Sequence, residues 1–531
     1  MSSKDRVHHG AFADSESGSA LSQHQYLKQA RMRVGHAVLI AGAPLFCALA
    51  IANSAGYQYG ISDLATYLTA AFRSVDPLLF PRDAALLEAQ TRLTLADEAI
   101  GLALRASSVL GLSEFATVYT LHVGTLLLLY IATIAFGRAL FRSWWSVAAL
   151  TAALTIRHAV PYTRVNTLEG YFHPRTVAFA LGVAALAVFL RRGIWPALAI
   201  AATGTVIHAI TGFWFLICLG VAGVVSEHRD RGRLLVLGIA AASVGAAALV
   251  AVSFAGRLAQ MDADWLAVLD SRKYLFPDRW PLDAWLICGG YVLAIAFAAN
   301  QRRNAGCLTP RERGLLCGAA ALLGIVILML PLLLVRSALA VQLQPLRVFW
   351  ILDLFATVSL IWLIAERRPL QGPRAPVALA LVLLAFSCVR GVYFMTIRYP
   401  ERSIAAIAPP PDPWQDAMRW AQSTDVRSHW LADPDHAFLY GTSLRVSGRR
   451  DLFLDASKDP AVAIYDRAVA MRVAERSHAL ADFRTLTLER VRDLTRRYDL
   501  DYLITEAVLP LPLAYQNARF KVYSLRPELS H

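Results

Sequence analysis

Long uninterrupted runs of apolar residues constrain this chain more than any other feature of its sequence. The segments VGTLLLLYIATIAF (123–136) and GAAALLGIVILMLPLLLV (318–335) approach the roughly 20 residues that cross the hydrocarbon core of a bilayer. Hydrophobic residues fill 56% of the 531 positions, and charged residues fill only 17%. We therefore expect a mainly α-helical protein that crosses a membrane many times.

The net charge of +13 is typical of nucleic-acid-binding proteins, but its distribution argues against nucleic acid as a partner. Lys and Arg concentrate in short connectors between apolar runs, which the positive-inside rule assigns to the cytoplasm. These connectors are GRALFRS, RRG, EHRDRGR, NQRRNAGCLTPRER and ERRPLQGPR. Residues 1–36 are polar and mixed in charge, which predicts a disordered cytoplasmic tail without a cleavable signal peptide. We expect a multi-pass membrane protein with a cytoplasmic N-terminus.

One apolar run, residues 195–225, is longer than one membrane span needs and shorter than two full ones. Basic connectors flank it on both sides, so a single crossing would put them on opposite faces. We interpret the run as two short helices that meet near His208–Thr211. The protein then has about 11 spans. The other predicted spans are 37–54, 114–136, 144–160, 175–190, 234–254, 284–299, 315–335, 347–365 and 376–397.

This topology divides the chain into a transmembrane domain, 37–397, and an extracytoplasmic C-terminal domain, 398–531. Alternating helix-like and strand-like segments after the proline-rich APPPDP linker predict a small α/β fold for the C-terminal domain. The first outer loop, about 55–113, contains apolar residues at helical spacing. We expect amphipathic helices there that lie along the outer membrane surface. A third outer segment spans 255–283.

The first outer loop carries the motif that suggests a function. Asp63 and Tyr67 stand one helical turn apart directly after the first span, and VDPLLFP (75–81) follows the helix. In this motif and in its architecture the chain resembles the GT-C membrane glycosyltransferases, such as protein O-mannosyltransferases, oligosaccharyltransferases and lipid A aminoarabinose transferases. Members of that family often carry Asp-Glu-x-x-Tyr at this place, whereas Leu64 replaces the Glu here.

The resemblance implies transfer of a sugar from a polyprenyl-phosphate carrier to an acceptor hydroxyl on the outer face of the membrane. Such a reaction needs a carboxylate that accepts the hydroxyl proton, and Asp63 is the candidate base. Tyr67 and Asp76 are expected to contact substrate. The structural alternative is that Ser62-Asp63 merely caps the following helix.

The departing phosphate would need cations at the bilayer boundary. The outer connector VRSALAVQLQPLRVFW (335–350) supplies Arg336 and Arg347 without an acidic residue, and Gln344 lies beside them. The structural alternative is that both arginines are interfacial side chains at span ends. No cofactor is expected other than the lipid-linked sugar as donor substrate.

The segment IRHAVPYTRVNTLEGYFHPR (156–175) is dense in polar and aromatic side chains at an outer span end. Glu169, His173 and Arg175 are the candidates for substrate contact there, although many such side chains are ordinary interface anchors. Asp262-Ala-Asp264 forms a DxD pattern, which by itself is weak support for a metal, and we predict no metal site. His208 is expected to be a core or gate residue.

Two ionisable residues fall inside predicted spans. Asp353 lies about 9 Å inside the tenth span, and Arg390 lies at a similar depth in the last one. Buried charges in a membrane are costly and are usually paired, so we predict that these two residues form a structural ion pair.

A different class of function stays open. The chain could be a transporter, a flippase or an assembly protein for envelope polysaccharide, with other envelope proteins as partners. A transporter concentrates polar groups near the membrane midplane. Here they cluster at the outer boundary, which favours a reaction site that faces outward.

Overall fold

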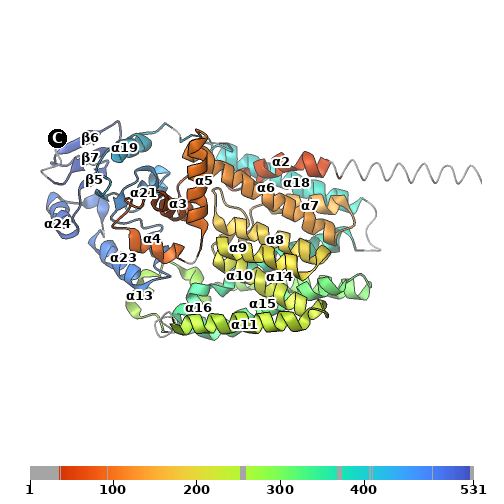
Figure 1. Cartoon of the computed structure of the whole chain (residues 1–531). Coiled ribbons are helices and arrows are strands. Elements are labelled where there is room, and N and C mark those ends of the chain that lie inside the picture. Colours follow the sequence, from red (N-terminus) through yellow and green to blue (C-terminus); the bar gives the residue numbers. More distant parts are fainter. Residues whose placement is uncertain are drawn as a thin grey trace, which may run out of the picture.

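The computed structural model describes residues 35 and 37–526, apart from 93, 252–258, 368–373, 406, 407, 410 and 481. An apolar helical bundle forms one body, and a smaller C-terminal domain covers one end of it (Figure 1). We call the covered end of the bundle the domain side. The predicted disordered tail, 1–36, lies outside the described residues except for Gly35.

Seven helical stretches of the described chain are long and apolar enough to cross a membrane. They are α6 (Glu114–Leu140), α8 (Pro174–Arg192), α10 (Ala209–Ser226), α14 (Leu282–Asn304), α15 (Pro310–Leu334), α16 to α17 (Ala338–Leu343 and Phe349–Ala365, with η3 at Pro345–Val348 between them) and α18 with η4 (Ala375–Tyr393 and Phe394–Arg398). Three shorter apolar helices accompany them: α2 (Gly42–Asn53), α7 (Trp144–Thr155) and α9 (Ile194–Ile207). The mainly helical membrane architecture is confirmed, and the count of eleven spans stays a prediction.

The long apolar run 195–225 folds as two helices that meet at His208, as predicted, but only α9 is short, because α10 is long enough to cross a membrane by itself. Helix α9 ends at Ile207, α10 begins at Ala209, and His208 lies between them. A Cβ atom on Gly223, near the end of α10, would lie 2.8 Å from the side chain of Ile194 at the start of α9. The two helices therefore run antiparallel. Both ends of the pair return to the same side of the bundle, where the basic connectors meet.

Small residues allow α10 to pack closely against α15. A Cβ atom would lie 2.3 Å from the carbonyl oxygen of Cys218 if added to Gly318, and 2.6 Å from that of Ala222 if added to Gly314. Close backbone approach of this kind is a common way to join membrane helices, where the hydrophobic effect does not hold them together. Helix α11 (Arg231–Ala251) packs beside α10.

The first outer loop differs from the prediction. It forms three helices, α3 (Ser62–Val75), α4 (Ala84–Thr91) and α5 (Ala96–Val109), and an interruption between Thr91 and Ala96 separates the last two. The interruption has a local cause: Thr94 Oγ1 donates to the carbonyl of Ile207 and accepts from the backbone N–H of Ala96. Residues 64–72 of α3 are all buried. The C-terminal domain covers this helix, so α3 is not a membrane-surface helix (Figure 1).

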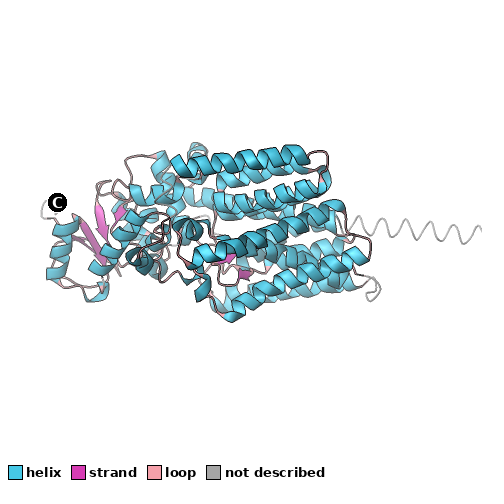
Figure 2. Cartoon of the chain, turned by 90° about the horizontal axis from the view of Figure 1, so that it is seen from below, coloured by secondary structure: helices cyan, strands magenta, loops and turns pink. Residues whose placement is uncertain are grey.

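The C-terminal domain is built on a five-stranded mixed sheet in the order β4-β3-β5-β7-β6. Figure 2 shows this sheet at the far end of the molecule and the short pair β1–β2 within the bundle. The strands are β3 (His429–Leu431), β4 (Asp451–Leu452), β5 (Tyr502–Thr505), β6 (Leu513–Gln516), β7 (Lys521–Ser524), β1 (Ala159–Val160) and β2 (Val165–Asn166).

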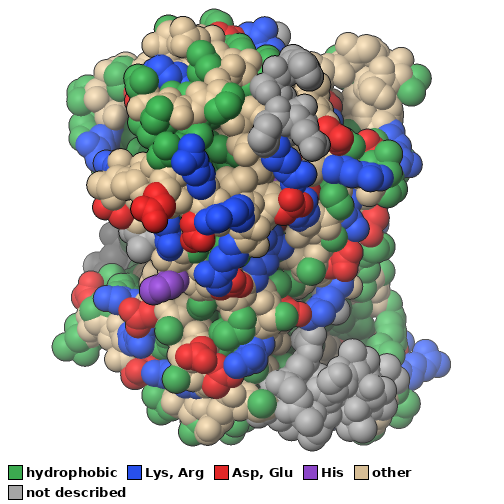
Figure 3. All heavy atoms as spheres, turned by 90° about the vertical axis from the view of Figure 1, so that its left-hand side faces the viewer, with side chains coloured by type: hydrophobic (Ala, Val, Ile, Leu, Met, Phe, Trp, Pro, Cys, Tyr) green, Lys and Arg blue, Asp and Glu red, His purple; other side chains and the backbone are tan. Residues whose placement is uncertain are grey.

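Short helices surround the sheet. They are α19 (Pro413–Gln422), α20 (His436–Tyr440), α21 (Leu444–Ser447), α22 (Asp459–Val462), α23 (Arg467–Ala479), η5 (Phe483–Thr485) and α24 (Leu488–Tyr498). The segment 259–281 contains α13 (Ala263–Val268), η1 (Lys273–Leu275) and η2 (Pro277–Arg279), and α13 packs on α23. Figure 3 shows Lys and Arg interspersed with Asp and Glu across the middle of the face that this domain turns away from the bundle, as expected of a surface in water.

Candidate active site

Asp63 lies at the boundary between the bundle and the C-terminal domain, as the second residue of α3. Its Oδ2 atom lies 3.0 Å from Nε2 of His173, and its Oδ1 atom lies 2.5 Å from Nζ of Lys458. Helix α3 begins after Ile61 and has no side-chain cap. The interpretation of Asp63 as a helix cap is therefore wrong. Its carboxylate instead joins a residue of the bundle to a residue of the C-terminal domain.

The hydrogen bonds of His173 fix which of its nitrogens carries the proton. His173 precedes α8, and its Nδ1 atom accepts from the backbone N–H of Arg175 at 3.0 Å. Nε2 therefore carries the proton and donates it to Asp63. Burial, reinforced by the nearby Arg175 charge, lowers the pKa of His173 to about 4. The imidazole is thus neutral at neutral pH, and it orients Asp63 without contributing a positive charge.

The charge state of Asp63 follows from its neighbours. Burial alone would raise the pKa of this carboxyl, but the ammonium of Lys458, the hydrogen bond from His173 and the charge of Arg175 together hold it well below its usual range. Asp63 is therefore ionised at neutral pH. While Lys458 remains in contact, this carboxylate is a poor proton acceptor, because the ion pair stabilises its charged form.

A second carboxylate, Glu169, lies on the turn between β2 and α8 and is buried together with Arg175. Nη2 of Arg175 donates to Oε1 of Glu169 at 2.9 Å, and Arg157 lies 3.5 Å from the other carboxylate oxygen. Asn166 donates to the same carboxylate. The Nε atom of Arg175 is buried and has no hydrogen-bond partner among the described residues. Arg175 therefore keeps an unused donor close to Asp63.

Arg347 is the least compensated cation of this region. It lies in η3, the short helix that directly follows Gln344, and the backbone of Gln344 is left-handed at φ 47°. Within the described chain, Arg347 forms no ion pair, and its buried Nε atom has no partner. Arg347 lines a small cavity together with Gln344 and the side chain of Tyr274. Its electrostatic neighbours include Asp63 and Arg175.

Gln344 connects this cation to the C-terminal domain. Its Nε2 atom donates to the hydroxyl of Tyr465 at 3.1 Å, while its buried Oε1 atom has no partner among the described residues. Tyr465 is in turn an electrostatic neighbour of both Arg347 and Asp63. A polar ligand in this place would meet an unused acceptor on Gln344 and an unused donor on Arg347.

Seven of the residues singled out in the sequence therefore share one site: Asp63, Tyr67, Glu169, His173, Arg175, Gln344 and Arg347. Tyr67 lies against His173, with their ring centroids 5.8 Å apart. His208, at the turn between α9 and α10, lies at 6.1 Å from the His173 ring and caps α10 by accepting from Thr211 N–H. Sequence reasoning missed Lys458 and Tyr465, which come from the C-terminal domain and follow no recognisable motif.

Two of the proposed substrate-binding residues lie elsewhere. Asp76 ends α3, is exposed and accepts from the backbone N–H of Leu78. Arg336 is paired with Asp278 through both terminal nitrogens, at 2.9 and 2.7 Å, and its guanidinium lies 4.5 Å from the centre of the Phe276 ring. Arg336 is therefore already neutralised, in contrast to Arg347.

The predicted ion pair between Asp353 and Arg390 is wrong. Within the described residues, Asp353 instead contacts Nδ1 of His158 at 2.9 Å, and Arg390 donates to the backbone and side-chain oxygens of Asn53 at 3.0 and 2.9 Å. Similar depth in two spans does not make two side chains neighbours, because each span also has a facing direction. His158 lies in the short segment between α7 and β1, and this segment places its side chain beside Asp353.

The DxD pattern of the outer segment has a structural use. Asp262 accepts from the backbone N–H of Trp265 as the cap of α13 and pairs with Arg467 of the C-terminal domain at 2.5 Å. In the described part of the chain, no group of three or more His, Cys, Asp or Glu residues is arranged to hold a metal ion.

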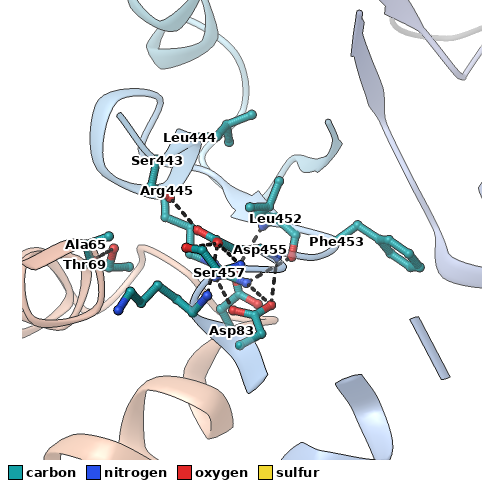
Figure 4. A network of polar contacts seen from close by, with 12 residues as sticks. Ala65, Thr69, Asp83, Ser443, Leu444, Arg445, Leu452, Phe453, Asp455 and Ser457 are labelled. Carbon is teal, nitrogen blue, oxygen red and sulfur yellow. Dashed lines mark hydrogen bonds and ion pairs between the residues drawn. The ribbon is translucent and has the colours of Figure 1, made fainter. Parts of the chain in front are cut away.

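A buried polar network holds the C-terminal domain in position over the site (Figure 4). Asp83, which follows α3, is fully buried against the C-terminal domain, where Arg445 donates to it at 2.7 Å. Two nitrogens of Arg445 also donate hydrogen bonds to the carboxylate of Asp459, at 2.6 and 3.0 Å. Asp455 accepts from the backbone N–H groups of Ser457 and Lys458. This network fixes the turn that carries Lys458 to Asp63.

The contact between Lys458 and Asp63 predicts a protection pattern. The chain has five lysines, of which Lys273 is exposed and Lys458 is half-buried in its ion pair. A short pulse of an amine-reactive reagent, quantified by mass spectrometry, should label Lys458 much more slowly than Lys273. In Asp63→Asn, the labelling of Lys458 should rise several-fold while that of Lys273 stays constant. Equal Lys458 labelling in both proteins would mean that the pair does not form in solution.

No protein-family model matches the chain, and no curated protein matches it. The function must therefore follow from the chemistry of the site itself.

Proposed function

We propose that this protein is a membrane glycosyltransferase of GT-C-like architecture in a bacterial inner membrane. It would transfer a sugar from a polyprenyl-phosphate-type lipid carrier to an acceptor hydroxyl on the outer face, where the C-terminal domain would lie. Asp63 would act as the general base. The observation that carries the proposal is that a carboxylate and the uncompensated guanidinium of Arg347 share one site at the domain side.

The donor half of the reaction requires cations that are not already neutralised. The glycosyl–phosphate bond breaks as the acceptor attacks the anomeric carbon, and both electrons of that bond leave with the phosphate oxygen. Arg347 has no carboxylate partner in the described chain, and Arg175 retains a free Nε donor. These two guanidinium groups would bind the phosphate and stabilise its growing charge.

The acceptor half of the reaction requires that Lys458 moves. The acceptor hydroxyl would take the place of the Lys458 ammonium at Oδ1 of Asp63, and its proton would pass to that oxygen as the new glycosidic bond forms. Removal of the ammonium also removes the main attraction that keeps Asp63 weakly basic. His173 would hold Oδ2 throughout, so that Oδ1 points at the acceptor.

The polar groups of the site support a transferase more than a transporter. They belong to the first outer loop, the turn before α8, the η3 connector and the C-terminal domain, all at the domain side of the bundle. A transporter would need its binding groups at the midplane, where both sides can reach them. A lipid-linked donor reaches a boundary site by lateral diffusion in one leaflet.

A matched pair of arginine variants tests the proposal. Arg347→Gln should lower kcat/KM for a polyprenyl-phosphate sugar by about 10- to 100-fold, because one charge-assisted contact to the phosphate is lost. Arg336→Gln should change kcat/KM little, since Arg336 already forms an ion pair with Asp278. The measurement is transfer of labelled sugar by the purified full-length protein from a panel of polyprenyl-phosphate donors. No transfer from any donor by the wild type, or equal transfer by both variants, would contradict the proposal.

A further inference from the structure

A second cavity, of about 330 Å³, lies apart from the Asp63 site. It opens between the last turn of α3, the second half of α5 and the C-terminal domain. Phe72, Leu104 and Leu112 contribute apolar walls. The polar walls are mainly cationic, because Arg105 comes from α5 and Arg449 and Arg450 come from the loop before β4. Its volume falls at the small end of the range for ligand sites.

The arginines of this cavity are only partly neutralised. Arg105 donates to the backbone carbonyls of Ser74 and Val75, at 2.8 and 3.2 Å. Arg450 likewise donates to backbone carbonyls, and neither arginine forms an ion pair with a described carboxylate. Backbone carbonyls hold a guanidinium in place but leave its charge intact.

The third arginine has one acidic partner. Arg449 pairs with Glu114, and its guanidinium stacks 3.9 Å from the centre of the Phe72 ring. Its Nε atom is buried without a partner among the described residues. Asp76 is the other carboxylate in the wall, and it is exposed. Three cations therefore face two carboxylates, which leaves a net positive site with an aromatic floor.

An apolar surface adjoins the mouth of the cavity. Leu102, Val109, Leu110 and Leu112 are 70%, 86%, 74% and 50% exposed, and we call them the α5 patch. Leu112 also lines the cavity, and α6, a candidate membrane span, begins at Glu114. The α5 patch therefore lies beside the start of a candidate membrane span. Apolar side chains exposed there, next to arginines, are typical of segments that sit in the headgroup region.

We propose that this cavity binds the phosphate headgroup of an anionic membrane lipid from the leaflet next to the C-terminal domain. Arg105 and Arg449 contact the phosphate, and the acyl chains run over the α5 patch. The charge of the cavity and the apolar character of its rim favour a lipid over a soluble anion. This site is independent of the proposed transfer reaction and does not require Asp63.

Native mass spectrometry of the detergent-purified full chain tests this proposal by titration with phosphatidylglycerol and with phosphatidylcholine. The wild type should bind phosphatidylglycerol more tightly. Arg105→Gln should weaken that binding about fivefold, the usual contribution of one arginine at a charged membrane surface. The matched control, Arg497→Gln, changes an exposed arginine on α24, far from the bundle (Figure 1), and should leave the affinity unchanged.

A second set of measurements distinguishes binding of the whole lipid from binding of a phosphate group alone. Leu110→Ser should weaken the binding of phosphatidylglycerol, and an excess of inorganic phosphate should displace little of it. Complete displacement by inorganic phosphate would overturn the lipid assignment, since it would show a simple anion site. Equal affinity for the two lipids, or an Arg105→Gln affinity equal to that of the wild type, would overturn the site.

Discussion

Asp63→Asn should lower the rate of sugar transfer from a polyprenyl-phosphate donor by a factor of about 10² to 10⁴, which is the usual contribution of a positioned general base. Asparagine has nearly the same shape as aspartate, and its amide oxygen still accepts the hydrogen bond from His173. It cannot take the proton of an acceptor hydroxyl. The initial rate of transfer of labelled sugar by the purified full-length protein measures the effect.

The control for this substitution lies on the same helix. Asp76→Asn changes an exposed carboxylate at the end of α3, away from His173 and Lys458, and should leave the rate near that of the wild type. Equal rates for wild type and Asp63→Asn would remove Asp63 from the reaction. A loss of the same size in both variants would indicate that α3 as a whole, rather than its first carboxylate, is needed.

Arg445→Met should lower the free energy of unfolding by about 3–5 kcal/mol, because it leaves two buried carboxylates without their shared cation. Asp83 and Asp459 are 0% and 1% exposed, and both pair with Arg445, although Asp83 keeps a second ion pair with Arg472. Thermal and denaturant unfolding in detergent measure the loss. Because the same network fixes the turn before Lys458, amine-reactive labelling of Lys458 should rise as well.

Arg467→Met is the matched control for this effect. Arg467 also joins the C-terminal domain to the segment before α14, through Asp262, but both partners are about half exposed. Exposed ion pairs add little to stability, so the unfolding curve should stay close to that of the wild type. If Arg445→Met behaved like Arg467→Met, the buried network would not be what holds the domain in place.

Much of the architecture could be predicted because membrane spans obey strong rules. The awkward run 195–225 illustrates this, since its length and its two basic flanks together required a turn, and His208 is found at that turn. Asp63 and the 157–175 segment could also be assigned to one site, because both directly follow span ends that face the same side. These inferences use only sequence order and the side of the membrane.

Contacts that depend on facing direction or on the C-terminal domain could not be predicted. Asp353 pairs with His158 rather than Arg390 because a short turn brings the histidine to it. Lys458 and Arg445 lie in the C-terminal domain, and no sequence motif predicts that this domain lies over α3. The burial of α3 follows from that placement, so its amphipathic pattern was attributed to a membrane surface rather than to a protein partner.

The connection between Asp63 and Lys458 spans 395 residues of chain, and that between Asp83 and Arg445 spans 362. Both acidic residues belong to the beginning of the protein, and both cations belong to its end. During synthesis, the early loop therefore leaves the ribosome long before the groups that neutralise it exist. Until the C-terminal domain is made, the two aspartates of this loop lack these cationic partners. The Asp63 site is thus completed late in biogenesis, and a polypeptide that stops short of the last domain would reach the membrane without the C-terminal partners of Asp63 and Asp83.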